Sequence, residues 1–224
     1  IVLSHGHFDH TGGLGKIAAL GGNRTVYGHP DLFNERFSVK GENWLSIGIP
    51  FSRKELEAEG LIFSLDTAPQ EVVPGLRTSG EIPRVVPMIF PGLMSGGKEA
   101  LEPDLFRDDL FMLADTDWGY VLMLGGTHSG LANTLEHAMK MTGGKPIRAA
   151  VGGLHLIKAD DRRIEESVEL LNRAGMEYCF PCHCTGFRAV CRVGSEYGNH
   201  FSEASVGSEF VFRKEGIEII PCEI

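Results

Sequence analysis

The stretch Ser4-His5-Gly6-His7-Phe8-Asp9-His10-Thr11-Gly12-Gly13 is the most informative part of this sequence. It places four potential metal ligands within six residues, after a short apolar run and among glycines; they are His5, His7, Asp9 and His10. His5 and His7 are two residues apart, so in extended backbone both point the same way and can share one metal. A following turn can bring Asp9 and His10 to a second metal. Imidazole and carboxylate ligands suit zinc, and also iron or manganese.

Two later histidines follow predicted strands and complete the ligand set. His128 lies in Gly125-Gly-Thr-His-Ser-Gly130, directly after a predicted strand, and we expect it at the first metal. His183 lies in Pro181-Cys-His-Cys-Thr-Gly186, between a predicted strand and a helix, and we expect it at the second. The alternative, a polar loop with scattered histidines, fits poorly, because the whole chain has only nine histidines. The sequence therefore predicts a site for two divalent metal ions. Zinc is the expected metal, with iron or manganese as alternatives.

Composition and charge restrict the partners. The 224 residues, 42% of them hydrophobic, are enough for a substantial core, and we expect one domain over residues 1–224. No apolar run approaches the roughly 18 residues that cross a bilayer, so we expect no membrane partner. A net charge of −9 without a Lys/Arg-rich block disfavours nucleic acid and favours a small-molecule substrate. Five cysteines, mostly clustered in one segment, argue against a disulfide framework and for a reducing cytoplasm.

The order of predicted elements indicates an α/β chain. Residues 1–4 and 25–27 are expected as strands, 14–20 as a helix, and Ser52-Arg-Lys-Glu55 as a capping box that begins another helix. Residues 61–91 resemble a meander of short strands, and 92–108 a loop or lid. Two strong strands, 109–114 and 119–124, form a predicted hairpin. Helices are expected at 133–141, 164–173 and 185–197, and strands at 147–151, 177–180 and 209–212. This alternation is typical of a mixed sheet covered by helices.

The motifs together resemble the metallo-β-lactamase superfamily. The order His-x-His-x-Asp-His, then Gly-x-His-x-Gly after paired strands, then a histidine at a late strand end is similar to its ligand pattern. The resemblance implies an αββα sandwich, in which two mixed β-sheets pack face to face with helices outside. Relatives carry further strands before the first motif, so we expect the N-terminal strands of the fold to lie outside this sequence.

Three segments resemble one branch of that superfamily, the dihydropterin-type synthases. These segments are Ser46-Ile-Gly-Ile-Pro-Phe51, Val151-Gly-Gly-Leu-His-Leu156 and His183-Cys-Thr-Gly186. The resemblance implies condensation of a hydroxymethyl-dihydropterin diphosphate with a ribofuranosyl-aminobenzene phosphate. Similarity of this kind supports a site more firmly than a reaction.

The sequence departs from the superfamily pattern where most two-zinc members carry a bridging Asp. The predicted strand at 147–151 ends instead in Gly152-Gly153, so we expect no bridging carboxylate and a more positive pair of metals. We expect these glycines to leave open space for a bulky or phosphorylated substrate. His155, two residues further on, is a candidate substitute ligand, substrate contact or proton donor; a structural role is the alternative.

Three functions are consistent with these residues. The first is a metal-dependent hydrolase that acts on a small, phosphorylated substrate through metal-activated water. The second is a transferase that forms a pterin–arylamine bond, and the third is a non-catalytic metal-binding module. Asp9 is the general-base candidate in either enzyme, and His155 the second catalytic candidate. Gly152, Gly153 and His155 are the expected substrate-binding positions.

Overall fold

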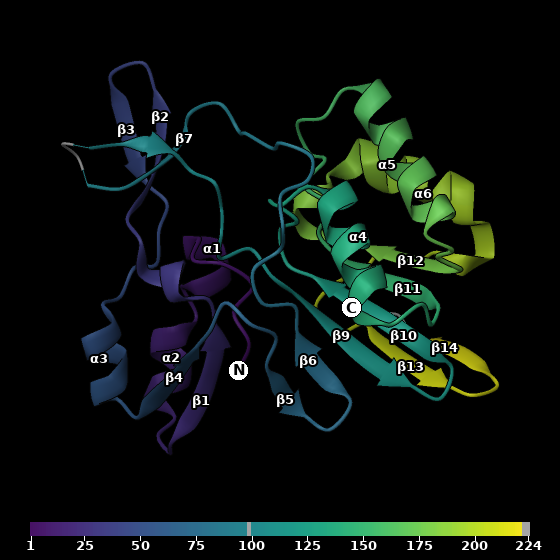
Figure 1. Cartoon of the computed structure of the whole chain (residues 1–224), viewed down its shortest axis with the longest axis horizontal. Coiled ribbons are helices and arrows are strands. Elements are labelled where there is room, and N and C mark those ends of the chain that lie inside the picture. The colour runs from purple at the N-terminus through teal and green to yellow at the C-terminus, as the bar shows by residue number, and fades with distance from the viewer. Residues whose placement is uncertain (98–99, 221–224) are drawn as a thin grey trace.

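The computed structural model describes residues 1–97 and 100–220, and Figure 1 shows its elements. The α-helices are α1 (Phe8–Thr11), α2 (Leu14–Ala19), α3 (Arg53–Ala58), α4 (Leu131–Met141), α5 (Asp161–Arg173) and α6 (Phe187–Tyr197). Three short 3₁₀ helices are η1 (Pro30–Phe33), η2 (His183–Thr185) and η3 (Gly198–His200). In the described part of the chain, no helix has the length and apolar character needed to cross a membrane.

A six-stranded mixed sheet has the strand order β12-β11-β10-β9-β6-β5. Its strands are β5 (Glu71–Val73), β6 (Leu76–Thr78), β9 (Phe111–Thr116), β10 (Gly119–Leu124), β11 (Ile147–Gly152) and β12 (Tyr178–Pro181). The predicted hairpin is confirmed as the antiparallel pair β9–β10, whereas β10, β11 and β12 run parallel. Parallel strands end at the same edge of a sheet, so the segments that follow β10, β11 and β12 meet there.

Helices cover one face of this sheet and a hairpin covers the other. The parallel connections from β10 to β11 and from β11 to β12 run through α4 and α5, as crossovers require. Leu122 packs with the buried sides of α4, α5 and α6, whereas its neighbour Val121 packs with Phe210 and Phe212. Adjacent strand residues point to opposite faces. The hairpin of β13 (Glu209–Arg213) and β14 (Gly216–Ile220) therefore lies on the face opposite the helices.

The N-terminal half is built on the parallel pair β1 (Arg24–Gly28) and β4 (Leu61–Leu65). Helices α2 and α3 contribute Leu14, Ala18 and Leu56 to its core, and α3 begins with the predicted capping box. The strand expected at residues 1–4 is shorter than predicted, because only Val2 makes a bridge, to Tyr27. After Leu3 the chain turns away from β1, and the Ser4 carbonyl accepts a hydrogen bond from the Leu110 N–H.

A four-stranded sheet with the order β3-β2-β7-β8 projects from the N-terminal half, apart from helices α4 to α6 (Figure 1). Its strands are β2 (Arg36–Lys40), β3 (Asn43–Ser46), β7 (Leu93–Ser95) and β8 (Glu102–Pro103). The prediction of a loop over residues 92–108 was therefore wrong in part. Strands of two or three residues carry no periodicity of their own, and β7 forms by pairing with the distant β2.

Candidate metal centre

The backbone of the histidine-rich stretch turns sharply after His7. The turn separates the candidate ligands into two pairs. His7 is the last extended residue, and the single helical turn α1 follows it. His5 and His7 precede the turn, whereas Asp9 and His10 lie within it. The segments after β10 and β12 bring His128 and His183 to the same place.

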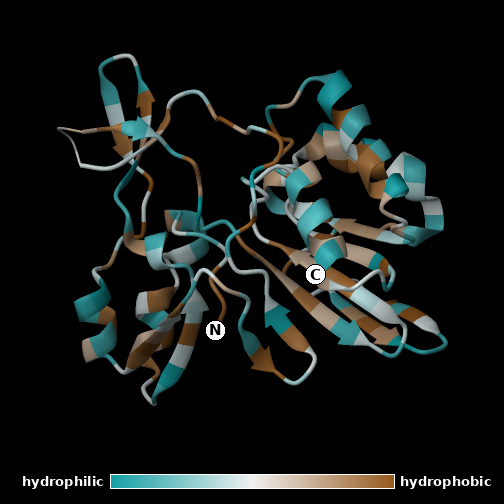
Figure 2. Ribbon diagram, in the orientation of Figure 1, coloured by the Kyte–Doolittle hydropathy of each residue, from teal (hydrophilic) through white to brown (hydrophobic). Residues whose placement is uncertain are grey.

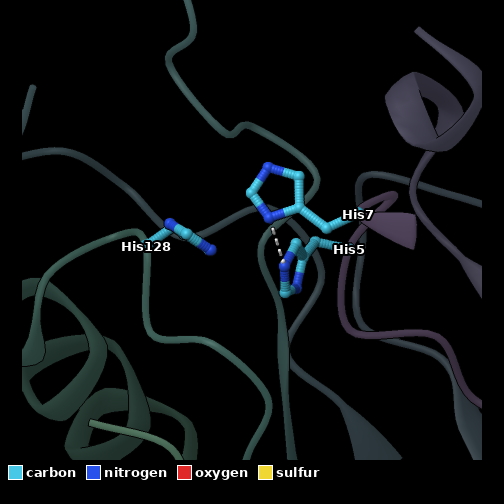
Figure 3. A group of neighbouring side chains, drawn as sticks. All are labelled: His5, His7 and His128. Atoms are coloured by element: carbon cyan, nitrogen blue, oxygen red, sulfur yellow. Dashed lines mark hydrogen bonds between the residues drawn. The ribbon is translucent and has the colours of Figure 1, made fainter. Parts of the chain in front are cut away.

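One group of potential ligands consists of His5, His7 and His128. Figure 3 shows the three imidazoles facing one another, His5 and His7 from one segment and His128 from another. Their ring centroids are 4.7 to 4.8 Å apart and their planes cross at 70° to 89°. All three side chains are buried. The second group consists of Asp9, His10 and His183, and it is more open, because Asp9 is 40% exposed and His183 is 43% exposed.

The spacing of the donor atoms fits ligands that share a metal. His5 Nε2 lies 3.1 Å from His7 Nδ1, and His10 Nε2 lies 3.0 Å from His183 Nε2. The Asp9 carboxylate is 3.2 Å from the His183 Nε2 atom. Zinc–nitrogen bonds of about 2.0–2.1 Å in a tetrahedron place two ligand nitrogens about 3.3 Å apart. Asp9 is the only carboxylate in either group of the described residues.

Burial holds the first three imidazoles in the form that binds a metal. Burial lowers the pKa of His7 to about 4, and burial together with neighbouring histidines holds the pKa of His5 and of His128 well below the ordinary value. A neutral imidazole has a lone pair to donate, whereas a protonated one does not. The donor set therefore fits a divalent metal ion.

A buried arginine behind the first group fixes the His-x-His loop. Arg36 lies between two buried carboxylates, with Nε 2.8 Å from Asp104 and Nη2 2.6 Å from Asp108. Asp108 Oδ2 accepts a hydrogen bond of 2.7 Å from the N–H of Gly6, the residue between the two histidines. A Cβ atom at Gly6 would lie 2.1 Å from the Leu32 carbonyl oxygen. Only glycine fits this position.

A second carboxylate fixes the segment that carries His128. Asp109 Oδ2 accepts hydrogen bonds of 2.7 Å and 2.6 Å from the backbone and hydroxyl of Ser129. Phe106 stacks on the His128 ring at 4.2 Å with an angle of 8°. Arg36, Asp108 and Asp109 were not predicted from the sequence as part of the site. The available signal was a pair of acids just before a buried strand, where charge is rare unless it is partnered.

Backbone strain gathers at this site. Among the described residues, positive φ angles outside glycine occur at Phe106 (47°), Thr127 (54°), His155 (52°) and His183 (51°). Phe106 stacks on His128, Thr127 precedes it, and His155 and His183 line the adjoining pocket. Such backbone costs about 1–3 kcal/mol per residue and clusters where function requires a geometry.

The structure changes the interpretation of Gly152 and Gly153. The expected open space is absent there, because a Cβ atom would lie 2.0 Å from the Leu124 carbonyl oxygen at Gly152 and 2.4 Å from that of Gly125 at Gly153. Neither glycine lines the pocket. The missing side chains allow the ends of β10 and β11 to approach each other, so that expectation was wrong. His155 does line the pocket, with its ring 4.2 Å from that of His128, but it belongs to neither donor group.

The pocket beside the two donor groups has a volume of about 670 Å³. His7, Asp9, His10, His128 and His183 all contribute to its lining. Burial lowers the pKa of His155 to about 4, so its ring is neutral near pH 7. The pocket therefore joins candidate metal ligands to a space large enough for a small molecule.

Comparisons with known proteins identify the family of this chain. Residues 1–132 match the model of the metallo-β-lactamase superfamily. The chain belongs to this superfamily. It is 30% identical over 219 residues to the 7,8-dihydropterin-6-methyl-4-(β-D-ribofuranosyl)-aminobenzene-5'-phosphate synthase of Methanocaldococcus jannaschii, covering 95% of this chain and 74% of the relative. An uncharacterized protein of the same organism is 29% identical over 210 residues, covering 92% of this chain and 76% of that protein.

A solved structure supports the fold directly. The crystal structure of a metal-dependent hydrolase of the β-lactamase superfamily superposes with a TM-score of 0.77 and 26% identity, covering 91% of this chain and 75% of that chain. The expected fold class, mixed sheets with flanking helices in the metallo-β-lactamase arrangement, is confirmed.

Proposed function

We propose that this superfamily member is a metal-dependent hydrolase that holds two divalent ions and acts on a small phosphorylated substrate. Zinc is the proposed metal. The observation that carries the proposal is the pair of donor groups, five of whose six residues line one pocket. Each group supplies three protein ligands, which leaves a coordination position open, as in catalytic rather than structural zinc sites. Bound there, the metals would lower the pKa of water towards 7 and polarise a substrate oxygen.

The side chains would divide the work as follows. His5, His7 and His128 would hold the first metal, and Asp9, His10 and His183 the second. Asp9 has its Oδ2 atom towards His183 and His10, so the other carboxylate oxygen is the candidate to accept a proton from water. His155 lies in the pocket outside both donor groups, which supports a role as a substrate contact.

A second candidate is the transferase that joins a hydroxymethyl-dihydropterin diphosphate to a ribofuranosyl-aminobenzene phosphate. Two observations favour it: the 30% identity to a synthase across 95% of this chain, and the apolar residues in the pocket lining, which include Phe90 and Ile157. In that reaction the arylamine substrate would displace diphosphate, and water would have to be kept from the reacting carbon.

One experiment separates the candidates. Zinc-loaded protein is incubated with the pterin diphosphate, with and without the arylamine, and separately with bis(4-nitrophenyl) phosphate. Cleavage of the diester alone supports the hydrolase, whereas diphosphate release that requires the arylamine supports the transferase. His5→Ala and His183→Ala should lose metal and activity. His200→Ala is the matched control, because His200 lies at η3 and stacks on Tyr178 away from the pocket. Full metal content in both ligand variants would refute the site assignment.

A further inference from the structure

Ser4 lies directly before the first candidate ligand, and its hydroxyl contacts one imidazole of each donor group. The Ser4 Oγ atom lies 3.1 Å from His5 Nδ1 and 3.4 Å from His10 Nδ1. His5 belongs to the buried group and His10 to the more open one. The two rings are themselves neighbours, with centroids 4.1 Å apart. A single half-buried side chain therefore touches candidate ligands of both metals.

The other ring nitrogen of each histidine faces its own donor group. His5 Nε2 lies 3.1 Å from His7 Nδ1, as the dashed line in Figure 3 marks, and His10 Nε2 lies 3.0 Å from His183 Nε2. A neutral imidazole carries one N–H and one lone pair, and the hydrogen bond at one nitrogen sets the state of the other. When Nε2 offers its lone pair to a metal, the proton is on Nδ1. The nitrogen that faces Ser4 is then the hydrogen-bond donor in both rings.

The Ser4 hydroxyl can accept both of these hydrogen bonds, because its oxygen has two lone pairs. Among the described residues, neither Nδ1 atom has another hydrogen-bond partner. A cavity of about 220 Å³ adjoins Ser4 and His10, and four residues of β9 and β10 that line it have no side-chain oxygen: Phe111, Met112, Met123 and Leu124. Figure 2 shows the largely hydrophobic colouring of these two strands. In such surroundings a hydrogen bond is stronger than in water.

The backbone on two sides fixes the position of the Ser4 side chain. The Ser4 carbonyl oxygen accepts a hydrogen bond of 2.9 Å from the Leu110 N–H, just before β9. A Cβ atom at Gly125, just after β10, would lie 2.2 Å from both Cβ and Oγ of Ser4. Gly125 has no positive φ angle that would itself require glycine. The absence of a side chain at Gly125 therefore provides the space that the Ser4 side chain fills.

We propose that Ser4 is a positioning residue that holds His5 and His10 with their Nε2 lone pairs towards the two metals. The proposal rests on the proposed function for the metals themselves, whereas the proton positions on the two rings can be measured without any bound ion. Groups that orient a ligating imidazole contribute about 10–100-fold to metal affinity. Because one hydroxyl orients a ligand in each group, its loss should weaken both ions. The effect should be larger for the ion at His5, whose hydrogen bond to Ser4 is shorter.

The test compares the wild-type protein with Ser4→Ala and Gly125→Ala, the second of which displaces the hydroxyl without removing it. Ser64→Ala is the matched control, because Ser64 is also half-buried and its hydroxyl donates to Gln70, outside both donor groups and the pocket. NMR of metal-free protein with ¹⁵N-labelled histidine shows which nitrogen of each ring carries the proton. We expect Nδ1–H at His5 and His10 in the wild-type protein and the control. Both variants should shift the two rings towards Nε2–H.

Zinc affinity is measured on the same proteins by competition with a chromophoric chelator. It should fall about 10–100-fold in Ser4→Ala and in Gly125→Ala and stay unchanged in Ser64→Ala. Urea unfolding checks that each variant folds, and Ser4→Ala decides the question if Gly125→Ala does not.

Three results would overturn the proposal. They are Nε2–H at either ring in the metal-free wild-type protein, unchanged proton positions in Ser4→Ala, and wild-type zinc affinity in Ser4→Ala. A wild-type protein that carries Nδ1–H on both rings but binds no zinc would instead refute the proposed function.

Discussion

Replacement of Asp108 by Asn tests how the buried charges behind the site hold the His-x-His loop. Asp108 has no exposed surface, contacts Arg36 at 2.6 Å and accepts the Gly6 N–H at 2.7 Å. Asn keeps the shape and an oxygen for Gly6 but removes the charge. Breaking a buried ion pair costs about 3–5 kcal/mol when the remaining charge has no partner. Because Asp104 still contacts Arg36, we expect a loss of about 2–3 kcal/mol in the free energy of unfolding.

The same substitution should weaken zinc binding, because partners that orient ligands contribute about 10–100-fold to metal affinity. Urea unfolding of metal-free protein measures the stability, and competition with a chromophoric chelator measures the affinity. Leu171→Ala is the control, since Leu171 is buried in the core on α5. Its truncation should lower the free energy of unfolding by a comparable amount, about 2–5 kcal/mol. Wild-type zinc affinity in Asp108→Asn, or an equal loss in Leu171→Ala, would refute the reasoning.

Three further predictions follow from single positions. Gly6→Ala should abolish zinc binding, because its Cβ would overlap the Leu32 carbonyl, and retained affinity would contradict the tight loop. Gly152→Ala should prevent stable folding, because φ is 126° and the Cβ would overlap the Leu124 carbonyl; a folded variant by circular dichroism would contradict it. Metal-free protein should lose stability as pH falls from 6.5 towards 4, because His155 with a pKa of about 4 takes up a proton only on unfolding. Urea titrations should show that a His155→Gln variant loses less free energy of unfolding over this pH range than the wild-type protein does, by up to about 3 kcal/mol. Equal losses in the two proteins would be inconsistent with the lowered pKa of His155.

Local patterns predicted the parts of the fold whose causes are local. The capping box at Ser52 and Glu55 was confirmed because its hydrogen bonds join residues three apart. The predicted β9–β10 hairpin was confirmed. It could be predicted because its strands are long, apolar and joined by a short turn. The alternation of strands and helices after residue 130 was also confirmed, since each element is long enough to show its own periodicity.

Features that depend on distant partners were not predicted. β7 is three residues long and exists through its pairing with β2. Asp108 acts on Gly6 across 102 residues of sequence, and no local pattern links the two. Gly152 was expected to leave open space for a substrate. The backbone at the end of β10 fills that space instead. The candidate ligands were recognisable from their spacing, whereas the groups that hold them required the tertiary structure.

The metal content of the purified protein tests the central claim most directly. Elemental analysis after equilibration with zinc and removal of unbound metal should give two ions per chain. His128→Ala should retain one ion, held by Asp9, His10 and His183, and His183→Ala should retain one, held by His5 and His7 with His128. One ion or none in the wild-type protein, or two in either variant, would contradict a centre built from these two groups.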